Sequence, residues 1–197
     1  IKPEPRLPIT VRVATERDLP FIDALEKKHG KAVGFASHKE LRSYLEQGQT
    51  ALIAEEVRDQ RSEVRDQRSE GTAGVLTSDL RPLTSGMPIG YCLYRDRYMK
   101  REDCGIVSHL AVDSSRHRGL VGAALVQAMF ERLPYGVRLF CLWCAQDLEA
   151  NRFWGALGFV PLAYRAGSRG KEHGGRRTGG TRVQIFWERR VRDGDEC

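Results

Sequence analysis

Long apolar runs are absent from this 197-residue sequence, which argues against a protein that crosses a membrane with helices. A membrane-spanning helix needs about 20 consecutive, mostly apolar residues, and no run in the chain approaches that length. The opening residues, IKPEPRLP, also lack the apolar core of a secretory signal peptide. We therefore expect a cytoplasmic protein without a membrane contact.

Cysteine is scarce and odd in number, which argues against a disulfide framework. Four of the five cysteines lie in apolar, strand-like runs and the fifth is the last residue: Cys92, Cys104, Cys141, Cys144 and Cys197. Cys141 and Cys144 have the spacing of a zinc or redox pair, but no second ligand pair follows them at zinc-site spacing. We expect buried free thiols and no metal site.

Positive charge is only slightly in excess over negative charge, with a net charge of +6. This value is modest for a nucleic-acid-binding protein and argues against nucleic acid as a partner, whereas an anionic cofactor or an acidic partner is compatible with it. An apolar content of 41% in 197 residues allows one sizeable core. We expect a single domain over residues 9–191.

Two segments lack the pattern of a packed element, and we interpret both as insertions in that domain. Residues 57–87 begin with the tandem heptapeptide VRDQRSE, which has one apolar residue per repeat and therefore cannot form a coiled-coil seam. Residues 168–182 contain GRGKEHGGRRTGG, whose glycine density disfavours a stable element. We expect a flexible loop at the first position and a Gly/Arg-rich flap at the second.

Hydrophobic periodicity predicts strands and helices over the rest of the chain. Helices are expected over residues 17–29, 39–47, 121–133 and 147–157. The first two open with capping-box spacing, Thr15 with Asp18 and Ser37 with Glu40, and Gly30 is expected to end the first. Strands are expected over residues 9–14, 50–56, 88–98, 104–112, 137–145, 159–165 and 181–191.

The stretch SHLAVDSSRHRGLVGAALVQAM, residues 108–129, has the order expected of an anion site: a strand, a basic glycine-bearing turn and a helix. The first turn of a helix has backbone N–H groups without intrahelical partners, and the helix dipole adds positive charge there. Gly119 and Gly122 would allow a ligand to approach the backbone closely. Arg116, His117 and Arg118 would surround that ligand with donors.

This turn resembles the coenzyme A pyrophosphate loop of the GNAT acyltransferase superfamily, whose pattern is Arg/Gln-x-x-Gly-x-Gly/Ala. Arg116-x-x-Gly119 matches the first half, and Val121 stands at the last position. A second block, DLEANRFWGALGF at residues 147–159, is similar to a later helix of the same superfamily. There Asp147 replaces the usual Asn and Trp154 the usual Tyr.

The resemblance implies an α/β fold of the α+β kind: a twisted, mostly antiparallel sheet of six or seven strands with flanking helices, splayed between the fourth and fifth strands. It also implies acetyl-CoA as the cofactor. The pantetheine would bond to the fourth strand at Leu110, Ala111 and Val112. The remaining implied cofactor contacts are Arg116, His117, Arg118, Gly119, Leu120, Val121, Gly122, Ala123, Asn151 and Trp154.

The implied reaction moves an acetyl group to a primary amine of a small molecule, a peptide or a protein. Members of the superfamily often place a glutamate on the fourth strand, where it acts as the general base. This chain offers three candidates for that base. Strict alternation favours Glu102, whereas a bulge in the strand would favour Asp103 or His109. Trp154 cannot act as the usual tyrosine acid, because an indole N–H only donates. Either the thiolate leaves unprotonated beside Trp154, or a tyrosine such as Tyr164 serves as the acid.

Alternatives to this function stay open at this point. The chain could be a catalytically weak or silent acyl-CoA-binding module, since the usual tyrosine and glutamate are missing. A nucleic-acid-binding domain that uses the basic flap is a further alternative. Members of the superfamily often line the acceptor site with the linker between the first two helices and the second helix, which points to Phe35, His38 and Tyr44. A homodimer is compatible with all of these.

Overall fold

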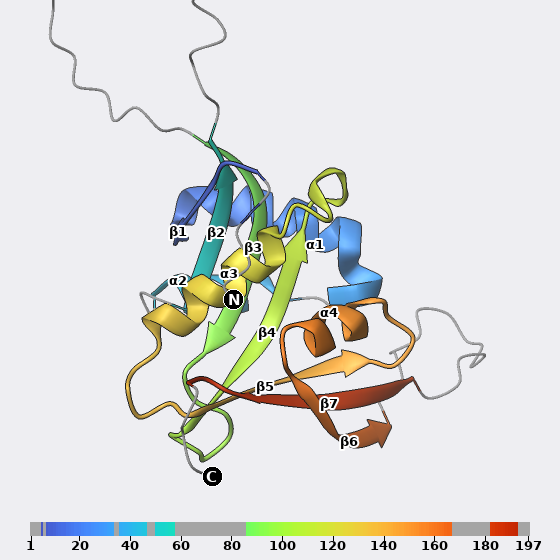
Figure 1. The fold of residues 1–197 in the computed structure, drawn as a ribbon. Helices are drawn as coiled ribbons and strands as arrows, with labels where there is room; N and C mark the ends of the chain where they lie inside the picture. Colours follow the sequence, from blue (N-terminus) through green and yellow to red (C-terminus); the bar gives the residue numbers. More distant parts are fainter. Residues whose placement is uncertain are drawn as a thin grey trace, which may run out of the picture.

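A single twisted sheet of seven strands organises the molecule, in the order β1-β2-β3-β4-β5-β7-β6 (Figure 1). In this computed structural model the described residues are 5, 7–33, 36–46, 50–57, 86–166 and 182–192. The strands are β1 (Ile9–Val13), β2 (Ala51–Glu56), β3 (Met87–Arg95), β4 (Cys104–Val112), β5 (Leu139–Ala145), β6 (Val160–Ala166) and β7 (Val183–Arg190). All neighbours are antiparallel except β4 and β5. The predicted fold class is confirmed.

The parallel pair of β4 and β5 is short and then opens. Only Cys104–Ile106 of β4 pair with Leu139–Cys141 of β5. Beyond these residues the strands diverge, so that β4 rises through Figure 1 while β5 runs across it. This is the splay expected between the fourth and fifth strands, and it leaves one side of the upper half of β4 without a neighbouring strand.

Helices cover both faces of the sheet, with a separate hydrophobic core under each layer. The helices α1 (Leu19–Val33) and α2 (His38–Glu46) pack on one face, over a core that includes Ile53 and Tyr91. The other face carries α3 (Val121–Arg132) and α4 (Ala150–Ala156), over a core built around Leu125, Phe140 and Trp187. The alternation of side chains along each strand supplies both cores.

The two predicted capping boxes are confirmed. The Asp18 carboxylate accepts from the backbone N–H of Thr15 at 2.7 Å and from its hydroxyl at 3.1 Å, and a 3-10 turn (Glu16–Asp18) then leads into α1. At α2 the Glu40 carboxylate accepts from the backbone N–H of Ser37 at 2.8 Å, while the Glu40 N–H donates to the Ser37 hydroxyl. Each box satisfies backbone donors that the helix itself leaves free.

Other predicted boundaries were wrong in detail. Gly30 does not end α1, which continues to Val33, because an exposed glycine can stay helical at a cost of about 1 kcal/mol relative to alanine. The strand predicted to reach Tyr98 ends at Arg95, and Tyr98 instead forms an isolated bridge with Arg101. The helix predicted from residue 147 begins at Ala150.

Several predictions fall on parts of the chain that lie outside the described residues. They concern the tandem heptapeptide, the Gly/Arg-rich flap, Phe35 and Cys197. Within the described ranges, the remaining four cysteines are free and buried as predicted. Those same ranges contain no helix long and apolar enough to span a membrane, and no cluster of side chains suited to a metal ion.

Candidate active site

The loop between β4 and α3 presents a group of unbonded backbone N–H groups. It begins with a 3-10 turn (Ser114–Arg116) and then takes left-handed conformations at Arg118, with φ 67°, and Leu120, with φ 61°. Among the hydrogen bonds of the described residues, none uses the N–H of Arg118 or the four N–H groups of residues 120–123. Consecutive free N–H groups at a helix start form an anion-binding concavity.

The glycines of this loop contribute space rather than unusual backbone angles. Gly119 and Gly122 have no left-handed φ. A Cβ at Gly119 would lie 2.8 Å from Leu7 Cδ1, so the segment that precedes β1 packs directly on the loop. A Cβ at Gly122 would lie 3.2 Å from the ring of Phe153 on α4. Each glycine therefore admits a neighbouring side chain, and the expected close approach of a ligand stays a prediction.

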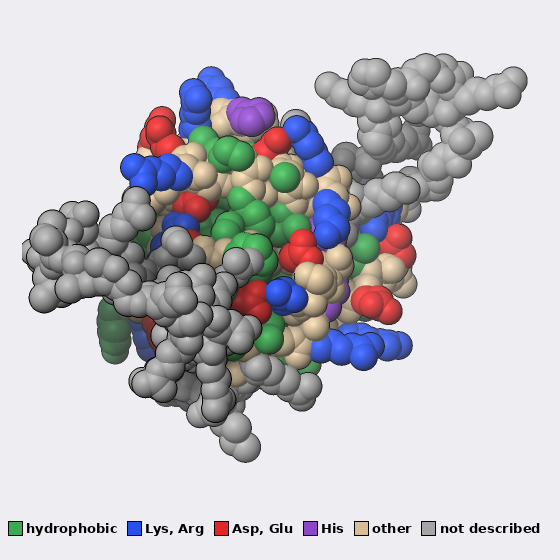
Figure 2. All heavy atoms as spheres, turned by 90° about the horizontal axis from the view of Figure 1, so that it is seen from above, with side chains coloured by type: hydrophobic (Ala, Val, Ile, Leu, Met, Phe, Trp, Pro, Cys, Tyr) green, Lys and Arg blue, Asp and Glu red, His purple; other side chains and the backbone are tan. Residues whose placement is uncertain are grey.

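A cavity of about 410 Å³ opens in front of this loop. Most residues predicted to contact the cofactor line it: Leu110, Ala111, Val112, Arg116, His117, Arg118, Leu120, Val121, Gly122 and Ala123. Gly119 does not. Sequence reasoning missed four further lining residues, namely His29, Glu149, Ala150 and Phe153. From above, Figure 2 shows hydrophobic side chains at the centre of the face, with acidic and basic side chains around them.

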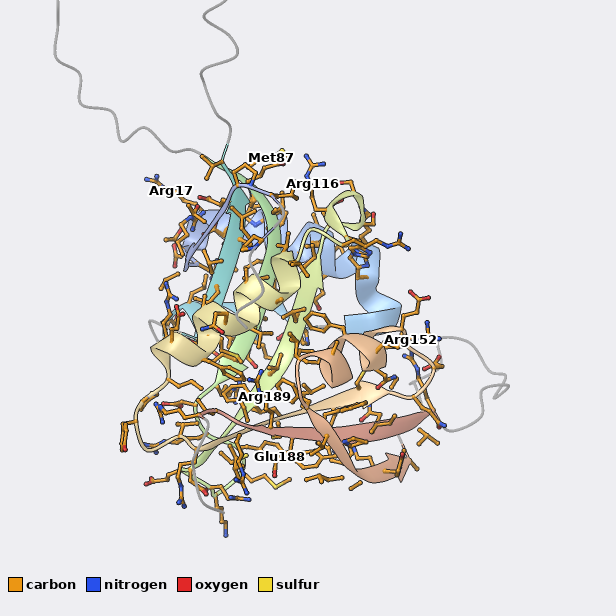
Figure 3. All side chains as sticks on the ribbon, in the orientation of Figure 1. Arg17, Met87, Arg116, Arg152, Glu188 and Arg189 are labelled. Atoms are coloured by element: carbon orange, nitrogen blue, oxygen red, sulfur yellow. The ribbon has the colours of Figure 1, made fainter. Side chains whose placement is uncertain are left out.

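The basic side chains of the loop differ in whether they already have a hydrogen-bond or ion-pair partner. Arg116, labelled in Figure 3, donates two hydrogen bonds to one carboxylate oxygen of Glu56, at 2.9 and 2.7 Å, so its charge is already paired. His117 Nε2 lies 3.1 Å from the Val112 carbonyl, and its ring stacks on His29. Arg118 is exposed, and its guanidinium has no hydrogen-bond or ion-pair partner among the described residues. Arg118 is therefore the loop's available cation.

A second cavity, of about 420 Å³, occupies the opening between β4 and β5. It shares Leu110, Glu149, Ala150 and Phe153 with the first, so the two cavities adjoin, and together they are called the cleft. Its inner end is lined by Ser108 and His109 from β4 and by Trp143 from β5. Trp154, only 5% exposed, contributes to the wall as predicted from the resemblance.

A β-bulge places His109 at this inner end. Leu93 of β3 pairs with His109, while the next residue, Tyr94, pairs with Val107, so Ser108 has no partner on β3. The Ser108 hydroxyl accepts a hydrogen bond of 2.7 Å from the hydroxyl of Tyr44 on α2. Burial lowers the pKa of His109, an effect that the nearby Glu40 carboxylate partly offsets. Its Nδ1 is buried and has no hydrogen-bond partner in the described part of the chain.

The other two candidate bases lie away from the cleft. Glu102 precedes β4, has a side chain 80% exposed and is paired with Arg97 at 3.4 Å. Asp103 binds Arg101 through two hydrogen bonds, of 3.0 and 2.8 Å. Both precede the paired start of β4 and β5, and neither lines either cavity. Of the three candidates, the structure brings only His109 into the cleft.

Asn151 and Tyr164 also depart from the predicted roles. The Asn151 amide donates to the carbonyls of Ala145 and Leu148, each at 2.8 Å, and its oxygen accepts from the indole N–H of Trp187 at 3.0 Å. Its polar atoms thus fix the turn before α4, and Asn151 lines neither cavity. Tyr164 is 64% exposed on β6 and lines neither cavity, so it has no position from which to act as the acid.

The two described candidates for acceptor contact behave differently. Tyr44 is 6% exposed. The guanidinium carbon of Arg95 lies over its ring, 4.9 Å from the ring centre. Through Ser108, Tyr44 supports the bulge beside His109. His38 has a side chain 70% exposed and lies 3.7 Å from the Asp23 carboxylate. Neither Tyr44 nor His38 lines either cavity, and Tyr44 reaches the site only through its hydrogen bond to Ser108.

No protein-family model matches the chain, and no curated protein matches it either. Solved structures do match it over nearly its whole length. The ribosomal-protein-S18-alanine N-acetyltransferase of Escherichia coli covers 95% of the chain and is itself covered to 97%, with a TM-score of 0.60 and 18% identity. The putative acetyltransferase yncA of Salmonella typhimurium, solved with acetyl-CoA, covers 96% and is covered to 99%, with a TM-score of 0.63 and 16% identity.

A third match is NAA60 of Arabidopsis thaliana in complex with a bisubstrate analogue. It covers 92% of the chain and is covered to 97%, with a TM-score of 0.61 and 14% identity. The chain has the GNAT fold. The GNAT fold predicted from two short sequence blocks is thus confirmed. At identities of 14–18% the likeness concerns the fold, and the activity has to be argued from the site.

Proposed function

We propose that this chain transfers an acetyl group from acetyl-CoA to a primary amine. The observation that carries the proposal is the pair of adjoining cavities, one at the loop N–H groups and the other at His109. One end offers donors for a diphosphate, and the other offers a base beside an opening in the sheet. Because β5 has left β4 between these ends, the main chain of Leu110–Val112 is free to bond an extended arm.

Acetyl-CoA would supply the acetyl group as a thioester. The N–H groups of residues 120–123 and the Arg118 guanidinium would hold the pyrophosphate, since charge-assisted hydrogen bonds are the strong ones. Arg116, already paired with Glu56, would chiefly fix the shape of the loop. Glu149 lines both cavities, and its carboxylate would repel a phosphate placed beside it.

His109 would accept the proton that the amine must lose. As the amine nitrogen bonds to the acetyl carbon, the carbon–sulfur bond breaks and its electron pair leaves with sulfur. The proton passes to a ring nitrogen of His109 and from there to solvent. Because burial lowers the pKa of His109, the ring is neutral at pH 7 and able to accept a proton. Trp154 would wall the channel and leave the thiolate unprotonated.

Charge reversal at Arg118 tests the cofactor end of the proposal. In calorimetric titration, acetyl-CoA should bind the wild type in the micromolar range and Arg118→Glu at least tenfold more weakly. A hydrogen bond to a charged group contributes about 1.5–3 kcal/mol, and about 1.4 kcal/mol is tenfold in affinity. Both side chains carry a Cβ, so the left-handed backbone at this position is strained equally in both.

Arg17→Glu is the matched control for that titration. Arg17 is exposed in the 3-10 turn before α1, and Figure 3 shows it on the β1 side of the molecule, away from Arg116. Its charge reversal should leave the affinity for acetyl-CoA unchanged. Equal losses in both variants would reduce the effect to net charge, and absence of binding to the wild type would refute the proposed cofactor site.

A further inference from the structure

Three aromatic side chains form a ledge on the face of β5 and β7 that does not carry α4. They are Tyr98, Trp143 and Phe186, and all are partly exposed. The Trp143 indole N–H donates to the Tyr98 hydroxyl at 3.0 Å. The Phe186 ring centre lies 5.0 Å from that of Trp143 and 6.4 Å from that of Tyr98. Partly exposed aromatic rings that hold one another in place offer a rigid contact surface.

Arg165 of the edge strand β6 lies across this aromatic ledge. Its guanidinium carbon is 3.7 Å from the centre of the Trp143 ring, a cation–π contact. Its Nε and Nη2 both donate to the Gln184 side-chain oxygen, at 3.0 and 2.8 Å. No acidic side chain of the described residues pairs with it, and it is exposed. The result is a cation with a fixed plane and an unmatched charge.

The strand register relates the aromatic ledge to His109. Cys141 pairs with Ile106 at the last rung before the splay, and Trp143, two residues further along β5, shares the face of Cys141. Trp143 and His109 then line opposite sides of the same cavity. The loop that would hold the pyrophosphate belongs to the α3 and α4 side of the sheet. An amine that meets the acetyl group must therefore arrive from the other side, past the aromatic ledge.

The charges around that approach are mixed, and Arg165 has no acidic partner among the described residues. Glu188 of β7 shares the face of Phe186, and Figure 3 shows Glu188 and Arg189 on opposite sides of the strand. On the α2 side, Glu40 caps its own helix and Arg95 covers the Tyr44 ring. A planar guanidinium that keeps donors free is suited to a carboxylate.

We infer that Arg165 and the aromatic ledge select an acceptor amine that carries a carboxylate. This inference rests on the proposed acetyl transfer. The carboxylate would bond to the guanidinium edge, and the chain between carboxylate and amine would lie over Trp143 toward His109. Stacking on Trp143 and the bonds to Gln184 limit the motion of Arg165, so little conformational entropy is lost on binding. The carboxylate can belong to a free amino acid or to an acidic side chain near a peptide N-terminus.

Pairs of acceptors, one with a carboxylate and the other with an amide in its place, test the inference. 4-Aminobutyrate is compared with 4-aminobutyramide, and the peptide Ala-Glu-Ala-amide with Ala-Gln-Ala-amide, by release of coenzyme A at saturating acetyl-CoA. Binding of the acetylated product of each is followed in parallel by the indole N–H signals of ¹⁵N-tryptophan-labelled protein with coenzyme A present. The variants are Arg165→Met, which keeps contact with Trp143, and Arg165→Lys. Arg152→Met on α4 removes an exposed charge elsewhere and is the control.

The carboxylate member of at least one pair should bind and react about tenfold better than its amide. Arg165→Met should abolish that preference through KM with little change in kcat, Arg165→Lys should keep part of it, and Arg152→Met should keep all of it. Equal behaviour of acid and amide in both pairs, or a preference that survives Arg165→Met, would overturn the inference. A carboxylate preference in product binding without any turnover would uphold the anion site and refute the transferase proposal instead.

Discussion

Replacing His109 by glutamine is expected to lower kcat for acetyl transfer about 100-fold or more, because a positioned general base typically contributes that much. His109 is the only one of the three candidate bases that lines the cleft, and its Nδ1 has no partner among the described residues. Glutamine retains a polar side chain of similar reach but cannot take up a proton at neutral pH. The measurement is single-turnover acetylation of the best acceptor found.

The pH profile separates a lost base from a disturbed site. Burial lowers the pKa of His109, so its neutral form persists below the ordinary histidine value of 6.5. Protonation of His109 should therefore add a fall in the rate of the wild type at pH values below 6.5, and His109→Gln should lack this acid limb. Ionisation of the acceptor amine gives a separate limb at higher pH in both proteins. Affinity for acetyl-CoA and melting temperature serve as controls and should stay unchanged.

Two results would contradict this role. A His109→Gln variant with unchanged kcat would remove His109 from the reaction. An unchanged acid limb in a slower variant would make His109 a packing residue of the bulge. Either result would leave the loop and its cofactor assignment intact, because that assignment is tested separately at Arg118.

Replacing Gly105 by alanine is expected to destabilise the fold by about 3 kcal/mol, since forcing extra atoms into a packed core costs roughly 1–3 kcal/mol and occasionally more. A Cβ here would overlap Cε2 of Phe140 and lie 2.7 Å from its Cδ2 and 2.8 Å from the carbonyl oxygen of Arg95. Phe140 is fully buried, and the carbonyl belongs to the neighbouring strand, so neither can retreat easily.

Gly136→Ala is the matched control, because nothing lies within 4 Å of the Cβ it would add. Thermal and urea unfolding of the two variants should show a melting temperature lowered by roughly 6–12 °C for Gly105→Ala and little change for Gly136→Ala. Equal stability of the two variants would show that the start of β4 and β5 relaxes more freely than the packing indicates.

Local sequence patterns were sufficient to predict the elements that depend on residues close together in the chain. Thr15 with Asp18 and Ser37 with Glu40 act within one helical turn, and both boxes form. The anion loop likewise depends on neighbours: a strand, a turn and the free start of α3 follow one another within residues 104–132. Most residues that line the cavity at this loop could therefore be predicted from the sequence.

The catalytic end depended on contacts between distant residues. The bulge at Ser108 is defined by pairing with β3 and by the hydroxyl of Tyr44, which lies 64 residues earlier. Alternation alone therefore favoured Glu102, which lines neither cavity. The side-chain oxygen of Asn151 accepts a hydrogen bond from Trp187, which lies 36 residues later. A side chain at position 119 would collide with Leu7, far away in the sequence. None of these partners leaves a signal in the local pattern.

The short pairing of β4 with β5 has a consequence for hydrogen exchange. Once β5 diverges, the main-chain N–H groups on the open side of β4 have no neighbouring strand to accept from them. A bound pantetheine arm would take the place of that strand. We expect the upper half of β4 to exchange with solvent deuterium faster than β3 in the free protein, and to slow selectively when the cleft is filled. In that sense the ligand completes the sheet, and its binding free energy becomes part of the stability of the fold.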